Sequence, residues 1–275
     1  MPVEFVEILA EEPSAEAALR LLVPKILNQC AFEVYPHNGK ADLLRKLPGL
    51  FAGYRIRRRN DPWFRNCCRA AVLVDRDQQD CRSLKQKMES AAKAAGLATR
   101  SQSGNHEYFV VNRIAVEELE AWFFGDWDAV RAANPKVAAT VPSQARFGWR
   151  GPQRGYAARP AYAHAGLGPH RPKPALRFAG ATPAFLPGGG PPSRISPPFA
   201  PILPTVQSGA TPANRRPDAI ANPWEALERV LKGYFPGGLR KIEAARAIAT
   251  HMDPERNPSP SFCAFRDILK EMASL

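Results

Sequence analysis

Two aspartates end an apolar run in the segment AAVLVDRDQQD, which spans residues 70–80. Asp75 and Asp77 are separated by one residue, and alternate residues that leave a strand project to the same side. Their carboxylates repel each other at short range, so the pair is either left in water or given a cation. The segment therefore predicts either a solvated turn or a cation site.

A second acidic pair, Glu11 and Glu12, follows the strand-like segment VEFVEILA at residues 3–10. If this strand neighbours the strand that ends at Asp75, both carboxyl ends lie at one edge of the sheet, where functional groups gather in parallel sheets. Three or more converging carboxylates need a cation, and hard oxygen ligands select Mg²⁺ or Mn²⁺. We therefore expect a Mg²⁺ or Mn²⁺ site with Glu11, Asp75 and Asp77 as ligands and Glu12 as a further ligand.

The elements that must position these groups alternate between strand and helix. After the first strand, Ser14 is expected to cap a helix with apolar residues at helical spacing. The apolar run before Asp75 is of the kind buried on both faces of a parallel sheet. The fold class is therefore α/β, a parallel sheet flanked by helices and followed by a helical C-terminal portion. Strands are predicted at residues 3–10, 31–37, 70–75 and 107–112, and helices at 14–27, about 40–50, about 81–95 with Gly96 at the end, 115–133, 223–233, 239–252 and 261–273.

Residues 146–217 differ in composition from their flanks. They contain no Asp or Glu, ten of the 38 Lys and Arg residues and roughly half of the 28 prolines. Such a composition cannot readily form a packed core, which predicts a disordered insert. Two origins remain open: a genuine insertion, or GC-rich DNA read out of frame and then back in. The predicted organisation is an α/β domain at 1–145, the insert at 146–217, and helices at 218–275 that pack on the α/β domain.

The net charge of +12 is concentrated in this insert, because the rest of the chain has 28 basic residues against 26 acidic ones. Charge alone is therefore no argument for nucleic-acid binding. No run of about 18 apolar residues and no signal peptide is found, so we expect a soluble, cytoplasmic protein that does not interact with a membrane. The five cysteines form no C-x-x-C pair and are expected to be reduced thiols.

The segments VEILAEEPSAEAAL and AVLVDRD together resemble the Toprim domain of topoisomerases, primases and OLD-type nucleases. More narrowly, the chain resembles the Toprim-related family catalogued as domain of unknown function 4276, through VNRIAVEELEAWFFGDWDAV, WEALERVL, LRKIEAARAIATHMDP and SFCAFRD. The resemblance implies a Toprim-like fold, with Glu11, Asp75 and Asp77 as motif residues and Glu120 as a later acidic position. It also implies nucleic acid as substrate and a separately encoded ATPase as a partner in defence or genome maintenance.

The expected activity is Mg²⁺-dependent phosphoryl transfer on nucleic acid, with Glu11, Asp75, Asp77 and Glu120 as catalytic residues. Hydrolysis is favoured because no nucleophilic side chain is placed convincingly for a covalent step. One departure from the Toprim pattern is Glu12 followed by Pro13, where many members have glycine. Two alternatives stay open: a non-catalytic accessory module that uses the same acidic pocket, and a D-x-D phosphatase, which would need a downstream Thr or Ser that DRDQQD lacks.

Each candidate residue also has a purely structural interpretation. Glu11 and Glu12 stand near a helix start, where acids favour the helix dipole. Asp75 and Asp77 would also suit a turn before a helix capped near Asp80. Glu117 and Glu120 are three apart and would share one face of the predicted helix, which could be solvated. The basic run at Arg55, Arg57, Arg58 and Arg59 is either a solvated turn or a guide for a phosphate backbone beside the acidic site.

Overall fold

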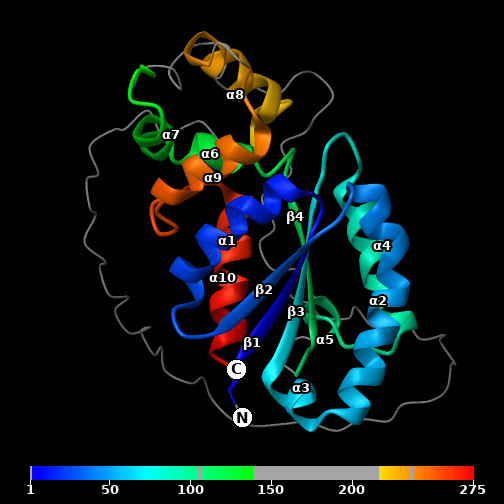
Figure 1. The fold of residues 1–275 in the computed structure, drawn as a ribbon. Helices are drawn as coiled ribbons and strands as arrows, with labels where there is room; N and C mark the ends of the chain where they lie inside the picture. The colour runs from blue at the N-terminus through cyan, green and yellow to red at the C-terminus, as the bar shows by residue number, and fades with distance from the viewer. Residues whose placement is uncertain (1, 104–106, 139–216, 236–237) are drawn as a thin grey trace, which may run out of the picture. The chain divides into compact units, whose positions relative to one another are not determined.

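The computed structural model describes residues 2–103, 107–138, 217–235 and 238–275. Four parallel strands form one sheet in the order β2-β1-β3-β4 (Figure 1). Their bounds are Phe5–Ala10 for β1, Ala31–Pro36 for β2, Cys68–Asp75 for β3 and Val110–Ala115 for β4. The predicted fold class, a parallel sheet flanked by helices, is confirmed. β1 pairs directly with β3, so the acidic residues that follow these two strands leave the sheet at neighbouring positions.

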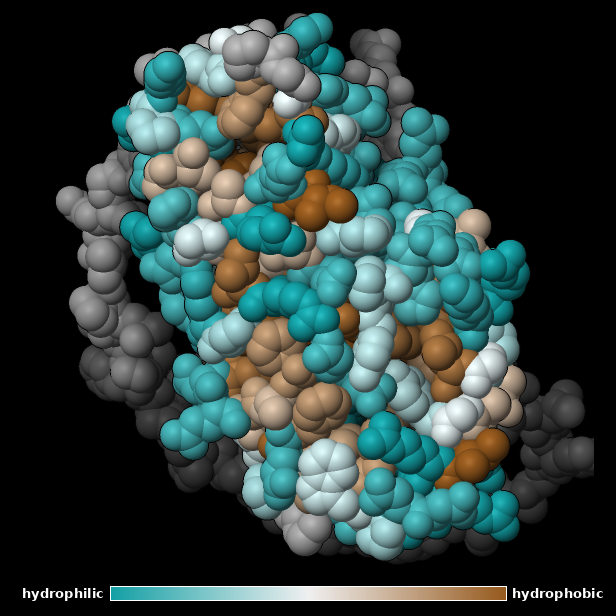
Figure 2. Space-filling model, viewed as in Figure 1, coloured by the Kyte–Doolittle hydropathy of each residue, from teal (hydrophilic) through white to brown (hydrophobic). Residues whose placement is uncertain are grey.

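One face of the sheet is covered by α2 (Lys40–Asn60) and α4 (Cys81–Ala94), with the short α3 (Pro62–Cys67) beneath the start of β3 (Figure 1). Leu84, Met88 and Ala92 recur every four residues along α4 and are buried, because this spacing keeps them on one side of a helix. Hydrophilic side chains predominate on the outer surface of α2 and α4 (Figure 2). These two helices are therefore amphipathic covers of the sheet.

The opposite face is covered by α1 (Pro13–Leu27) and by helices from the C-terminal part of the chain. Trp122 is fully buried there, and its ring packs against Phe262 and Phe265 at centroid distances of 5.1 and 5.6 Å. This packing joins residues on both sides of the proline-rich segment into one core. The remaining elements are α5 (Arg100–Ser103), α6 (Ala121–Gly125), α7 (Trp127–Ala133), α8 (Pro223–Leu231), α9 (Lys241–His251), α10 (Pro260–Ala273) and two short 3-10 helices at Pro217–Ala219 and Lys232–Tyr234.

Lys25 ties α1 to the end of α9. Its ammonium group donates hydrogen bonds to the backbone carbonyls of Ala249, Thr250 and Met252 at 3.1, 2.8 and 2.8 Å. The last carbonyls of a helix have no partner within the helix and attract a positive charge. Lys25 therefore fixes the position of α9 on α1, and α9 begins with Lys241 at the acidic edge of the sheet.

Two of the predicted element boundaries were wrong near the N-terminus. Ser14 does not cap α1, because the helix begins at Pro13 with Glu12 at the N-cap position, and the Ser14 hydroxyl donates a hydrogen bond to the Glu12 carboxylate. Proline suits this first position because its missing N–H would have no helical partner. The helix predicted at about 40–50 continues to Asn60 through Pro48.

The segment predicted as one helix at residues 115–133 is divided. β4 extends to Ala115, a turn follows, and only then do α6 and α7 begin. Glu117 has a φ of 65°, in the left-handed region that interrupts a helix. Glu117 and Glu120 therefore do not share a helical face, and the structure places Glu120 at the N-cap position of α6.

The predicted insert lies almost entirely outside the described residues, which resume at residue 217. Within the described part of the chain, no helix is long and apolar enough to cross a membrane. The five cysteines are unpaired.

Candidate metal site at the carboxyl edge of the sheet

The ends of β1 and β3 are joined by a side chain. Oε2 of Glu11 accepts a hydrogen bond from the backbone N–H of Asp75 at 2.9 Å. Burial raises the pKa of Glu11, and the nearby Asp77 and Glu12 act in the same direction against the Asp75 N–H and Lys40. The structure thus brings Glu11 next to the D-x-D segment at one edge of the sheet.

The loops that follow β3 and β4 continue the pairing of these strands beyond their ends. The Arg76 N–H donates to the Ala115 carbonyl and the Asp77 N–H to the Glu117 carbonyl, both at 2.8 Å. Asp77 and Glu117 both have left-handed φ angles, 48° and 65°. This turn redirects the chain after β4, so that the acidic residues after it face the end of β3.

Asp75 is more deeply buried than Asp77, with 8% of its surface exposed. Its Oδ1 accepts a hydrogen bond from the Leu119 N–H at 3.0 Å. Burial, the neighbouring Glu120 and then Glu11 raise the pKa of Asp75 well above its ordinary value. A buried carboxyl group beside two others holds its proton unless a cation is supplied.

Glu120 is almost completely buried, with 1% of its surface exposed. Among the described residues, neither of its carboxylate oxygens accepts a hydrogen bond. Burial raises the pKa of Glu120 to about 7, although the nearby Lys241 acts in the opposite direction. Buried charged groups are normally hydrogen-bonded, paired or bound to a metal, so a carboxylate at this position calls for a cation nearby.

Lys241, the first residue of α9, inserts its ammonium group between two carboxylates. Its Nζ lies 2.6 Å from Oε1 of Glu12 and 3.3 Å from Oε1 of Glu120. It also lies 5.7 Å from the centre of the Trp224 ring. Burial disfavours the ammonium, but Glu120 and Glu12 outweigh it and raise the pKa of Lys241 above its ordinary value. Lys241 is therefore held as a cation inside the acidic group.

Asp77 lies at the rim of the site rather than inside it. Half of its side chain is exposed, and its Oδ2 is 2.5 Å from Nζ of the buried Lys40 at the start of α2. Glu118 lies on the other side, where its Oε2 accepts a hydrogen bond from the Trp224 N–H at 2.9 Å. This bond attaches the start of α8 to the site.

The sequence-predicted residues thus occupy different parts of one site. Asp75 and Glu120 form its buried part, and the half-buried Glu11 joins them through its hydrogen bond to the Asp75 N–H. Glu12 is paired with Lys241, and Asp77 is paired with Lys40. Sequence reasoning missed both lysines. The only local signal for Lys40 was its place after Gly39 at a strand-to-helix turn, and Lys241 had none because it lies more than 100 residues from the other groups.

The donor set suits a hard divalent cation, since it offers carboxylate oxygens alone, of which the two on Glu120 are buried and unsatisfied. The ligands are not arranged around such an ion, however. Among the described residues, no three His, Cys, Asp or Glu side chains form a group ready to hold a metal. The positive charge at the site comes from Lys40 and Lys241 instead.

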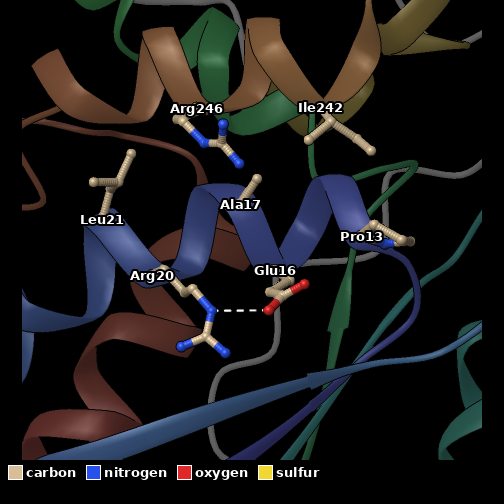
Figure 3. Close-up of a pocket in the computed structure, with 7 residues that line it drawn as sticks. All are labelled: Pro13, Glu16, Ala17, Arg20, Leu21, Ile242 and Arg246. Carbon is tan, nitrogen blue, oxygen red and sulfur yellow. Dashed lines mark hydrogen bonds and ion pairs between the residues drawn. The ribbon is translucent and has the colours of Figure 1, made fainter.

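A groove of about 300 Å³ runs between α1 and α9 (Figure 3). Pro13 and Ile242 line one end of it, and they directly follow Glu12 and Lys241 in the chain, so the groove starts beside this ion pair. Arg20 and Arg246 line it farther along. Arg20 pairs with Glu16, as Figure 3 shows, whereas Arg246 is exposed on the α9 side.

The basic run at residues 55–59 is neither a turn nor placed beside the acidic site, so both interpretations of it were wrong. It forms the last turns of α2, and Arg57 lies 17 residues after Lys40, about 25 Å along the helix. The Arg57 guanidinium stacks 4.0 Å over the Phe64 ring, and that of Arg58 lies 4.7 Å over Phe109. This run stabilises the other end of the molecule.

Comparison with known proteins gives one match. A family model described as a domain of unknown function (DUF4276) matches residues 10–153 and 204–270. These two stretches include every acidic residue of the site and Lys241, and they leave out residues 154–203 in the proline-rich segment. No curated protein and no solved structure matches the chain.

Proposed function

The chain belongs to the DUF4276 family, as its sequence indicated, and we propose that it is a Mg²⁺- or Mn²⁺-dependent enzyme that hydrolyses phosphodiester bonds of nucleic acid. The observation that carries the proposal is the buried Glu120 carboxylate, neither oxygen of which accepts a hydrogen bond among the described residues, near the buried Asp75 carboxyl. Functional sites are where burial and like charges shift pKa values in this way. A divalent ion between these groups would let both carry their negative charge.

Glu11, Asp75 and Glu120 are proposed to hold the ion. Asp75 and Glu11 each use one oxygen for a backbone N–H, which fixes their orientation and leaves the second oxygen of each for the ion. A bound Mg²⁺ polarises a phosphate and lowers the pKa of the attacking water. Asp77 at the rim is proposed to orient that water. Its partner Lys40 is proposed to orient the phosphate, since a lysine can bind phosphate as a point charge.

Support for a polynucleotide substrate comes from the groove between α1 and α9. It begins beside the site and leads to Arg246, which is exposed and available to a phosphate. Most contacts between proteins and nucleic acids go to phosphate and sugar. The similarity to the Toprim domain and a separately encoded ATPase partner stay predictions from the sequence resemblance.

The test is cleavage of supercoiled plasmid, linear duplex and single-stranded DNA and RNA in Mg²⁺ and Mn²⁺. We expect Asp75→Asn to lower the cleavage rate by at least about 100-fold, because even the loss of a group that supports a metal ligand costs about 10–100-fold. Asp128→Asn is the matched control. This aspartate is exposed on α7, and its ion pair with Arg131 is loose, at 3.9 Å. Cleavage of none of these polymers by the wild-type protein would overturn the proposal.

The lysines favour a second candidate, a non-catalytic module of a larger assembly. Lys40 and Lys241 already neutralise Asp77, Glu12 and part of the charge on Glu120, so the acidic group has an internal structural partner. A module of this kind would keep its biological activity when Asp75→Asn removes metal binding. The enzyme would lose both together.

A further inference from the structure

We infer that Lys241 holds the Glu120 carboxylate where a divalent cation would bind it and has to leave for the ion to bind, so that Lys241 sets the affinity of the site for metal. This inference rests on the proposed function. It explains why the acidic group is present without a ready arrangement of three ligands among the described residues.

The position of the Lys241 ammonium is that of a shared counter-ion. It contacts carboxylates from two separate elements, Glu12 at the start of α1 and Glu120 at the start of α6. Its distances of 2.6 and 3.3 Å are those of an ammonium contact, whereas Mg²⁺ binds carboxylate oxygens at about 2.0–2.1 Å. Both oxygens thus lie at the distances of an ammonium partner, which are longer than those of metal ligands.

Lysine and metal cannot share the position. A divalent ion at the same oxygens would repel the ammonium with twice the force of a second unit charge, in a place where burial weakens screening. The four-carbon stem of lysine is flexible, and the paired Lys241 and Glu12 side chains are 29% and 30% exposed, so solvent lies beside the ion pair. Lys241 can therefore move out while α9 stays fixed by Lys25 at its other end.

Replacement of Lys241 by methionine keeps an unbranched apolar stem and removes the competing charge. We expect Lys241→Met to bind Mn²⁺ about tenfold more tightly or better than the wild-type protein in isothermal titration, because the ion no longer displaces an ammonium. Lys241→Arg keeps the charge and should bind no more tightly than wild type. Lys232→Met removes one exposed positive charge elsewhere and should leave the affinity unchanged.

Equal or weaker Mn²⁺ binding by Lys241→Met than by wild type would overturn this inference while leaving the proposed function standing. Absence of Mn²⁺ binding by both proteins would overturn both. Circular dichroism shows whether Lys241→Met folds, since it leaves Glu12 and Glu120 without their cation.

A measurement on the wild-type protein decides the matter if the variant does not fold. Lysine labelling by an amine-reactive ester, read by peptide mass spectrometry, reports the accessibility of each ammonium. Saturating Mn²⁺ should increase labelling of Lys241 and leave Lys25 unchanged, because Lys25 is bound to backbone carbonyls at the far end of α9. Unchanged labelling of Lys241 would overturn the inference.

Discussion

The Glu11 carboxylate accepts a hydrogen bond from the backbone N–H of Asp75 at 2.9 Å, although 64 residues separate them. This bond is made at the ends of two adjacent parallel strands, where the β1–β3 ladder would otherwise stop. It brings Glu11, which follows β1, next to Asp75 at the end of β3. The chemistry proposed for the protein depends on this contact more than on either motif alone.

The stability of the metal-free protein should fall as pH rises from about 4.5 to about 7. Glu120 has its pKa raised from 4.5 to about 7 in the folded state, so the folded protein binds more protons than the unfolded chain over this interval. The full contribution is present below pH 4.5 and is lost as pH rises through about 7. The difference between these two pKa values corresponds to a loss of about 3 kcal/mol in the free energy of unfolding.

Urea unfolding in EDTA at pH 5, 6, 7 and 8 measures this dependence. Glu120→Gln cannot ionise, so it should flatten the profile and be the more stable protein at pH 8. A parallel decline in wild type and Glu120→Gln would mean that other groups cause it.

Asp77→Ala should destabilise the protein by about 1 kcal/mol more than Asp77→Asn. The φ of 48° at this position is left-handed, which asparagine adopts far more readily than alanine. Asparagine also keeps an oxygen that accepts a hydrogen bond from Lys40. Equal urea midpoints for the two variants would contradict the assigned backbone conformation. Both variants should lose metal-dependent cleavage, since both lack the carboxylate.

Lys25→Met should lower the free energy of unfolding by about 2 kcal/mol, because three backbone carbonyls at the end of α9 lose a charged donor. Chemical denaturation gives the value. The control is Lys93→Met on α4, an exposed lysine that should change stability by less than about 0.5 kcal/mol. A similar small change for Lys25→Met would show that α9 is held by apolar packing alone.

Arg246→Ala should weaken polynucleotide binding and reduce the slope of log affinity against log salt concentration by about 1, as expected for the loss of one phosphate contact. Fluorescence anisotropy with labelled single-stranded and duplex oligonucleotides at several salt concentrations measures it. Arg59→Ala, at the far end of α2, should leave both affinity and slope unchanged. If Arg59→Ala weakened binding and Arg246→Ala did not, the polynucleotide would bind at the basic run at residues 55–59 instead of the groove.

The sequence was sufficient for the elements that depend on local pattern. The apolar run before Asp75 predicted a strand buried on both faces, and β3 is buried along its whole length. The helix at Cys81–Ala94 and its end before Gly96 were also predicted correctly, because apolar spacing, the Asp80 cap and the glycine all lie within that segment. Such signals are local in sequence and need no information about distant residues.

The turn that separates β4 from α6 could not be predicted from local signals. The segment at 115–133 has helical spacing, yet pairing with β3 extends the strand to Ala115, and the Asp77 N–H binds the Glu117 carbonyl in a left-handed turn. Tertiary hydrogen bonds outweigh helix propensity here, since propensity is worth only a fraction of a kcal/mol per residue. Glu120 consequently enters the site from a helix start.

Sequence alone determined that this is a parallel α/β chain with acidic residues at the ends of two strands, because periodicity and composition act over short stretches. Only the tertiary structure decided that β1 lies beside β3, that Glu120 is buried near Asp75, and that Lys40 and Lys241 neutralise the group. Strand order and ion pairing are settled by the packing of distant segments into one core. No pattern within a single segment encodes the position of a lysine more than 100 residues away.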